Sequence, residues 1–203
     1  MKRHLTAVLI TLATSLAFTG CLGGQVKYPT HYTLQVPPPP DPPLAETVRT
    51  SLAVREFRSP EYLRQGAIVY RVSPEQIGFY DYHRWATDPR EFVTNAIVDR
   101  LRASGTFGSV KLYNGRSDVD YILSGRLDKL EEVDYGGGVR VQVAMSAQIT
   151  NLKTGATVWT NAVDDIEKVE QHSVPGVVSA MNRAMEKSIE KLVASVHVPQ
   201  AAQ

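Results

Sequence analysis

The sequence predicts an α+β fold, in which a mostly antiparallel sheet carries two main helices packed on one face and is preceded by a proline-rich tether. The first observation is the run over 139–150, where apolar and polar residues alternate as on a strand with one buried face. The second is a pair of segments, one after Asp88-Pro89 and one after Pro175, whose apolar residues recur at helical spacing. The third is the concentration of seven of the 12 prolines in residues 29–43.

Residues 1–20 have the features of a bacterial export signal. Two basic residues precede an uncharged, mainly apolar stretch from Leu5 to Phe18, which is shorter than the roughly 20 residues that a membrane-spanning helix needs. The small residues just before the single cysteine, Cys21, resemble a bacterial lipobox. The resemblance predicts a lipoprotein signal peptide over 1–20 and lipid attachment at Cys21, and Leu22 in place of Asp favours the outer membrane, facing the periplasm. The alternative is an ordinary signal peptide followed by a chance cysteine.

We expect residues 21–44 to form a lipidated, proline-rich tether. Because proline fixes φ and lacks an amide hydrogen, this segment favours extended polyproline II and would reach roughly 70 Å. A plain disordered spacer is the alternative. Tyr28, His31, Tyr32 and Leu34 indicate that the first half of the tether docks on a surface.

Residues 45–196 are expected to form the α+β domain, and residues 197–203 a disordered tail. In chain order we expect strands over 48–54, 67–72 and 76–85, a helix from Pro89 to Gly105, strands over 109–113, 119–127, 139–150 and 157–163, and a helix after Pro175. Asp88 can cap the first helix, and Gly105 can end it. The triple glycine at 136–138 and the sequence over 151–155 are typical of turns between antiparallel strands.

The composition argues against several classes of function. Lys and Arg together number 22 and Asp and Glu 21, so the chain has no basic footprint for nucleic acid, and a single cysteine excludes an internal disulfide. Glu131-Glu132 and Asp164-Asp165 are interpreted as solvated strand ends. The sequence has no nucleophile elbow, and the histidines of the mature chain lack metal-ligand spacing: His31, His83, His172 and His197. We therefore predict a protein that is not an enzyme, with no catalytic residue, metal or cofactor.

The run from Phe79 to Trp85 is rich in aromatic residues. Strict alternation places Tyr80, Tyr82 and Arg84 on one face of the strand and sends Phe79 and Trp85 to the other. Tyr and Arg are enriched at interface hot spots, so Tyr80, Tyr82 and Arg84 are candidate partner-binding residues. Core packing with a polar rim is the alternative interpretation.

The order of these features resembles a known family. A lipobox is followed by Tyr32-Thr33-Leu34, a proline linker, a strand, the motifs IVYR and YDYHRWATDP, and the segment FVTNAIVDRLRASGTFGSV. This succession resembles the auxiliary lipoprotein component of ABC-type transport systems, which accompanies MCE (mammalian cell entry) proteins and includes the paraquat-inducible C-protein type. The resemblance covers residues 28–195, and its most specific part runs from Ile68 to Val110.

The resemblance implies a non-enzymatic, outer-membrane lipoprotein that docks the MCE-domain protein of a system moving lipids or other hydrophobic molecules. It also implies a homo-oligomeric ring, and the family has no catalytic residue to carry over. Two alternatives stay open. One is a periplasmic module that binds lipid or a small ligand in a groove between helix and sheet. The other is an envelope-assembly lipoprotein unrelated to transport.

Overall fold

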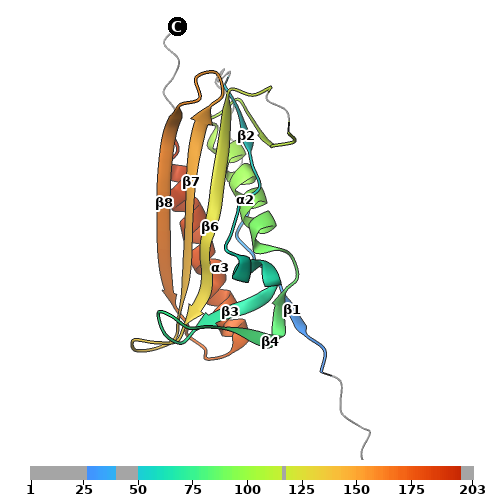
Figure 1. The fold of residues 1–203 in the computed structure, drawn as a ribbon, viewed down its shortest axis with the longest axis vertical. Coiled ribbons are helices and arrows are strands. Elements are labelled where there is room, and N and C mark those ends of the chain that lie inside the picture. The colour runs from blue at the N-terminus through green and yellow to red at the C-terminus, as the bar shows by residue number, and fades with distance from the viewer. Residues whose placement is uncertain (1–26, 40–49, 116–117, 198–203) are drawn as a thin grey trace, which may run out of the picture.

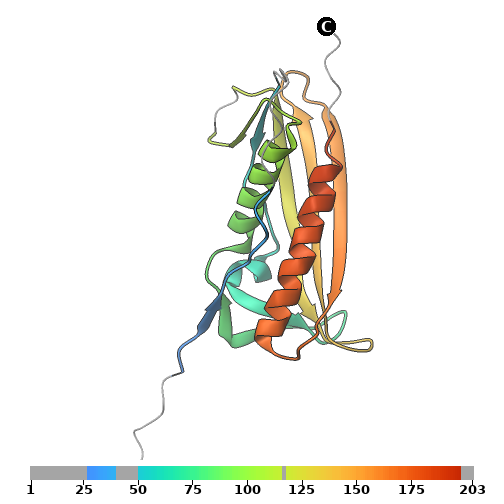
Figure 2. The same cartoon turned by 180° about the vertical axis from the view of Figure 1, so that it is seen from behind.

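The computed structural model describes residues 27–39, 50–115 and 118–197. They form one eight-stranded mixed sheet with two long helices on one face (Figures 1 and 2), which confirms the α+β prediction. The predicted signal peptide, Cys21, the boundary at Ala45 and residues 198–203 of the predicted tail lie outside the described residues. The elements are β1 (Thr30–Tyr32), β2 (Ser51–Val54), the 3-10 helix η1 (Glu61–Gln65), β3 (Ala67–Arg71), β4 (Ile77–Trp85), α2 (Pro89–Ser104), β5 (Ser109–Leu112), β6 (Tyr121–Val133), β7 (Arg140–Asn151), β8 (Thr157–Lys168) and α3 (Val174–Ala194).

Three long antiparallel strands form one side of the sheet. β6 pairs with β7, and β7 pairs with β8. The turn from β6 to β7 contains three glycines with φ of 75°, 99° and 106°, a backbone region that side chains disfavour. The turn from β7 to β8 is closed by Asn151, whose side-chain oxygen accepts hydrogen bonds from the amides of Lys153 and Thr154. Local sequence therefore determines both turns, and both lie where the sequence predicts them.

On the other side of β6, two short strands lie one after the other. β2 pairs in parallel with residues 121–123 at the start of β6, and β3 pairs in parallel with residues 131–133 at its end. β5 flanks β2, and β4 flanks β3. After β2 the chain stays hydrogen-bonded to β6 as far as Arg58. It lays the Phe57 ring over Gly125, where a Cβ atom would lie only 2.2 Å from the ring. The sheet is therefore mixed, although most of its residue pairs are antiparallel.

Both long helices begin at capping residues. Oδ1 of Asp88 accepts a hydrogen bond from the Arg90 amide at 2.9 Å, and Gly105 ends α2 with φ of 66°, as predicted. The Ser173 hydroxyl accepts from the Gly176 amide at 3.3 Å at the start of α3. α3 lies along β7 and β8 and buries an apolar stripe: Val177, Val178, Ala180, Met181, Ala184, Met185, Ile189 and Leu192. Because burying one large apolar side chain contributes about 1.5–3 kcal/mol, this stripe fixes the helix on the sheet.

Residues 30–37, within the predicted tether, lie on the domain. β1 adds to the sheet by parallel pairing with β4. Leu34 is 8% exposed and belongs to the main hydrophobic core. The amide of Gln35 donates to Asn182 of α3 at 3.1 Å, and the Arg100 guanidinium of α2 donates to the Pro37 carbonyl at 3.1 Å. The first half of the segment thus docks on the sheet and helices of its own chain.

Candidate functional site

Buried charged groups mark the candidate site, at the end of β6 where β3 and β4 join the sheet. Glu131 and Glu132 are consecutive in β6, yet they are only 0% and 6% exposed. Asp165 of β8 is equally buried, and only Asp164 is exposed. The interpretation of these two acidic pairs as solvated strand ends is therefore wrong for three of the four residues. The physical reason is that each buried carboxylate has a partner from another element.

Arg71, the last residue of β3, holds Glu131. Its Nε and Nη2 donate to the two carboxylate oxygens at 2.8 and 3.0 Å, which is the bidentate geometry that suits a guanidinium. The hydrogen bond to Glu131 raises the pKa of Arg71. Since the Arg71 side chain is only 17% exposed, removal of either partner would leave a charge with little access to water. The pair therefore locks β3 onto β6.

Tyr80 of β4 holds Glu132. Its hydroxyl donates to Oε2 at 2.7 Å. Burial is the main reason why the pKa of Glu132 and the pKa of Tyr80 are both raised. The Tyr80 hydroxyl therefore serves as a hydrogen-bond donor that connects β4 to the end of β6.

Aromatic contacts extend this connection to β1. The Tyr32 hydroxyl and Nδ1 of His83 lie 3.0 Å apart. Tyr80 meets His83 edge-on with ring centroids 5.7 Å apart, and Tyr70 meets Tyr80 at 5.2 Å. Edge-on aromatic pairs contribute about 0.5–1.5 kcal/mol each beyond their burial. The cluster thus ties β1, β4 and β3 into one rigid end of the domain.

The three predicted partner-binding residues do not share one surface. Tyr80 points into the interior, whereas Tyr82 is 46% exposed, with the Lys27 ammonium 5.6 Å from its ring centre. Arg84 is half-buried and donates to the Gln65 carbonyl at 3.1 Å. Of the three, Tyr82 is the one with free surface for a partner.

A bulge in β4 explains this separation. Ala67 of β3 pairs with Arg84, but Val69 pairs with Phe79, so two steps along β3 match five steps along β4. The three extra residues break the period of two on which strict alternation depends. The predicted division of this strand into two faces is therefore wrong, because the bulge arises from the pairing of β4 with β3 and is not visible in the local sequence.

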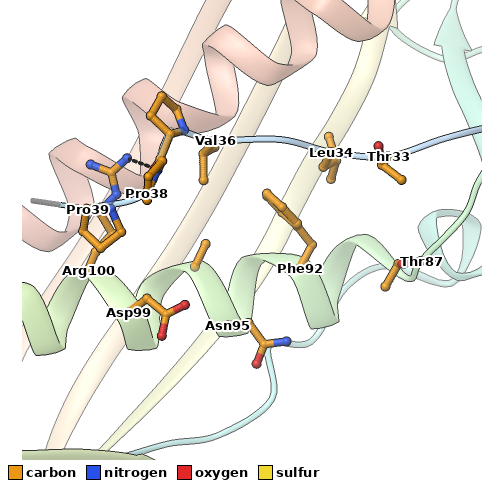
Figure 3. A pocket seen from close by; sticks show the side chains of 12 residues that line it. Thr33, Leu34, Val36, Pro38, Pro39, Thr87, Phe92, Asn95, Asp99 and Arg100 are labelled. Carbon is orange, nitrogen blue, oxygen red and sulfur yellow. Dashed lines mark hydrogen bonds between the residues drawn. The ribbon is translucent and has the colours of Figure 1, made fainter.

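A groove of 380 Å³ lies between the N-terminal segment and α2 (Figure 3). Leu34 and Val36 from the segment and Phe92 and Ala96 from α2 give it apolar walls. The groove also has a polar lining, whose side chains are labelled in the same view: Thr33, Thr87, Asn95, Asp99 and Arg100. Such a groove is at the small end of the range for ligand pockets, roughly 300–1,000 Å³. It suits a short apolar group.

The described ranges contain no group of three or more His, Cys, Asp or Glu side chains that could hold a metal ion. Within the same ranges, none of the helices is long and apolar enough to cross a membrane. Of the histidines, His83 belongs to the aromatic cluster, and Nδ1 of His197 lies 2.9 Å from the Ser195 carbonyl.

Arg71, the burial of the carboxylates and the position of the groove beside the N-terminal segment were not predicted from the sequence. A signal for the carboxylates was present: Glu131 and Glu132 stand between Leu130 and Val133 inside an apolar strand. Arg71 likewise ends an apolar strand and offers a countercharge. The groove had no signal, because it forms only when residues 33–39 lie beside α2.

Comparison with known proteins gives a family and a fold. Residues 32–193 match the family model described as the ABC-type transport auxiliary lipoprotein component. The crystal structure of a Xanthomonas campestris protein of family DUF330 superposes with a TM-score of 0.69 at 18% identity, covering 81% of this chain and 92% of that one. The crystal structure of an uncharacterized protein superposes with a TM-score of 0.65 at 15% identity, covering 84% of this chain and 99% of that one. The structure of a hypothetical Chlamydia trachomatis protein superposes with a TM-score of 0.50 at 7% identity, covering 72% of this chain and 95% of that one. These identities support a shared fold only, and no curated protein matches the sequence.

Proposed function

The chain belongs to the family of ABC-type transport auxiliary lipoprotein components, and on that premise we propose that it is the outer-membrane-anchored, periplasmic docking component of an MCE-type transport system. The system would carry lipids or other hydrophobic molecules. The family is one of transport-associated lipoproteins and not an enzyme family. In this proposal the domain contributes a rigid binding surface and no chemistry.

One observation carries the proposal. The family match runs from Tyr32 in β1 to Val193 in α3, so it includes the N-terminal segment that docks on the sheet. An acyl anchor at Cys21 would therefore pull on a folded domain through β1, which is held by the aromatic cluster and by Leu34. Several acyl chains, at about 0.8 kcal/mol for each buried CH₂, would give stable attachment.

The anchor is tested by Cys21→Ser. We expect this variant to leave the membrane fraction and to lose label from a fatty-acid analogue, because Cys21 is the only cysteine in the chain. Fractionation on sucrose gradients would separate outer from inner membrane for the unchanged protein. Label that persists in Cys21→Ser, or unchanged protein that sediments with the inner membrane, would contradict the proposal.

Docking is tested by co-purification of the MCE-domain protein and by native mass spectrometry of the assembly. The proposed contact residues remain Tyr80, Tyr82 and Arg84, toward the MCE partner or toward neighbouring copies in a ring. The structure separates their tests. Tyr82→Ala removes an exposed ring, so association should fall roughly thirtyfold, for a hot-spot loss of about 2 kcal/mol, while the melting temperature stays unchanged. Leu112→Ala is the matched control, because Leu112 is 49% exposed on β5. Equal association of both variants and the unchanged protein would refute a role for Tyr82.

The groove favours a second candidate function, the binding of a lipid chain by the domain itself. The alternative left open in the sequence analysis puts a groove between helix and sheet, whereas the 380 Å³ groove lies between α2 and the N-terminal segment. Ala96→Phe would fill it from the helix side. Native mass spectrometry should detect phospholipid on the unchanged protein and not on Ala96→Phe. Absence of lipid from both would leave docking as the function.

A further inference from the structure

The chain enters the domain at one end of its long axis. Figures 1 and 2 both show β1 beside β3 and β4 at this end, and the last turn of α3 at the opposite end. We call the end that carries Lys27, Tyr28, β1 and β4 the entry end. The turn over residues 151–155, between β7 and β8, lies at the far end with the last turn of α3.

Residues after Thr30 cannot lengthen the connection to the membrane. β1 is paired along its length with β4, the Tyr32 hydroxyl lies 3.0 Å from His83 Nδ1, and Leu34 is in the core. Nine residue steps separate Cys21 from Thr30, and even a fully extended chain would span at most about 32 Å. The roughly 70 Å reach expected for the whole proline-rich segment therefore does not apply to the folded domain.

The far end is much more distant from the anchor than the entry end. β7 has 12 residues and runs between the two ends, which corresponds to about 40 Å of strand. An anchor within about 32 Å of Thr30 thus holds the entry end near the lipid surface.

The side chains at the entry end suit a lipid–water boundary. Tyr28 is 81% exposed and Val72, which follows β3, is 38% exposed. A tyrosine ring has an apolar body and a polar tip, so it is stable where hydrocarbon gives way to headgroups. The Lys27 ammonium can meet lipid phosphates while its stem lies along apolar surface. Tyr82, with Lys27 near its ring, lies at the margin of this surface, where a neighbouring copy on the same membrane could contact it.

We propose that the entry end of the domain rests on the phospholipid surface that holds the acylated Cys21, and that the far end points away from the membrane. The proposal rests on the lipidation proposed above. It assigns the lipid surface to the entry end and leaves the far end accessible to proteins that approach from the periplasm.

Two fluorescent probes test this orientation in the full acylated chain. Acylation blocks the sulfur of Cys21, the only natural cysteine, so one engineered cysteine can be labelled selectively. Asp81→Cys places the probe on β4 two residues from His83, the partner of Thr30, and Lys153→Cys places it in the far turn. Both side chains are exposed, so the label should not disturb the core. The protein is reconstituted into vesicles of phosphatidylethanolamine and phosphatidylglycerol that contain a spin-labelled headgroup as the quencher.

We expect most of the fluorescence of the Asp81→Cys probe to be lost and that of the Lys153→Cys probe to stay unchanged. Equal quenching of both probes, stronger quenching of the far probe, or no quenching of either would overturn the orientation. If a labelled variant fails to melt like the unchanged protein, Thr30→Cys on β1 and Thr154→Cys in the far turn replace the pair, because both side chains are exposed. Intact-mass analysis separates the two proposals: a chain without the acyl mass overturns the lipidation and with it the orientation. An acylated chain with the wrong quenching pattern overturns the orientation alone.

Discussion

Replacing Glu131 by glutamine should destabilise the domain strongly, although the new side chain has the same shape. Glu131 is 0% exposed and accepts two hydrogen bonds from Arg71, at 2.8 and 3.0 Å. A glutamine offers one neutral oxygen and a competing NH₂ group, so the Arg71 charge stays buried without a counterion. Breaking a buried ion pair on one side costs about 3–5 kcal/mol. Because the amide leaves no cavity, we expect the lower end, about 3 kcal/mol, which corresponds to roughly 6–12 °C in melting temperature for a domain of this size.

The neighbouring Glu132 supplies the matched control. Burial raises the pKa of this carboxyl, so its ionised form is disfavoured in the folded state. Below the ordinary pKa of about 4.5 the carboxyl is protonated in both the folded and the unfolded state, so its burial does not destabilise the fold through desolvation of a charge. The cost appears as the pH rises through the raised folded-state pKa and is complete above it. Glutamine carries no charge and can still accept the Tyr80 hydroxyl, so Glu132→Gln should be neutral below pH 4.5 and neutral or stabilising at pH 7.

Thermal melts followed by circular dichroism, between pH 4 and pH 8, would measure both variants. At neutral pH we expect Glu131→Gln to lower the melting temperature and Glu132→Gln to leave it unchanged or raise it, although the two glutamates are consecutive in one strand. If Glu131→Gln melts with the unchanged protein, or if both variants lose the same stability, the assignment of separate partners to these carboxylates is refuted.

Three further changes test other parts of the fold. Gly125→Ala should cost about 1–3 kcal/mol, because its Cβ would lie 2.2 Å from the Phe57 ring; an unchanged urea midpoint would show that Phe57 can move aside. Leu34→Ala should cost about 2–3 kcal/mol and expose residues 30–37 to proteolysis, since Leu34 is 8% exposed in the core; cleavage no faster than in the unchanged protein would argue against docking of this segment. A chain shortened to begin at Ala45 should still melt cooperatively, but at a lower temperature than the mature chain, because it lacks β1 and Leu34; equal melting temperatures would mean that β1 adds nothing to stability.

The features that sequence reasoning predicted are those with local causes. The limits of α2 follow from Asp88 and Gly105, a cap and a left-handed residue whose effect needs no distant partner. The alternation over 139–150 likewise reports one buried face directly. β1 escaped prediction because it has three residues and depends on β4 for its pairing.

The features that could not be predicted from the sequence are contacts between residues far apart in the chain. Nothing near β2 or β3 indicates that both pair in parallel with β6. The burial of Glu131 depends on Arg71, which lies 60 positions earlier, and the position of Tyr80 depends on a bulge against β3. Alternation and helical spacing predicted the fold class, and resemblance to the family predicted the transport association, while the contacts at the entry end came only from three-dimensional pairing.

The placement of β2 and β3 along β6 has a consequence for the order in which the chain can fold. A polypeptide that crosses a membrane from its N-terminus presents β1, β2 and β3 first. None of these can close the sheet then, because β2 needs residues 109–112 and 121–123, and β3 needs residues 131–133. Most of the sheet has to wait until the second half of the chain has emerged, and the apolar stripe of α3 arrives last. Such non-local pairing slows folding. It thereby favours an extended chain during transit, and it would give a window for the proposed lipidation of Cys21 before the domain closes.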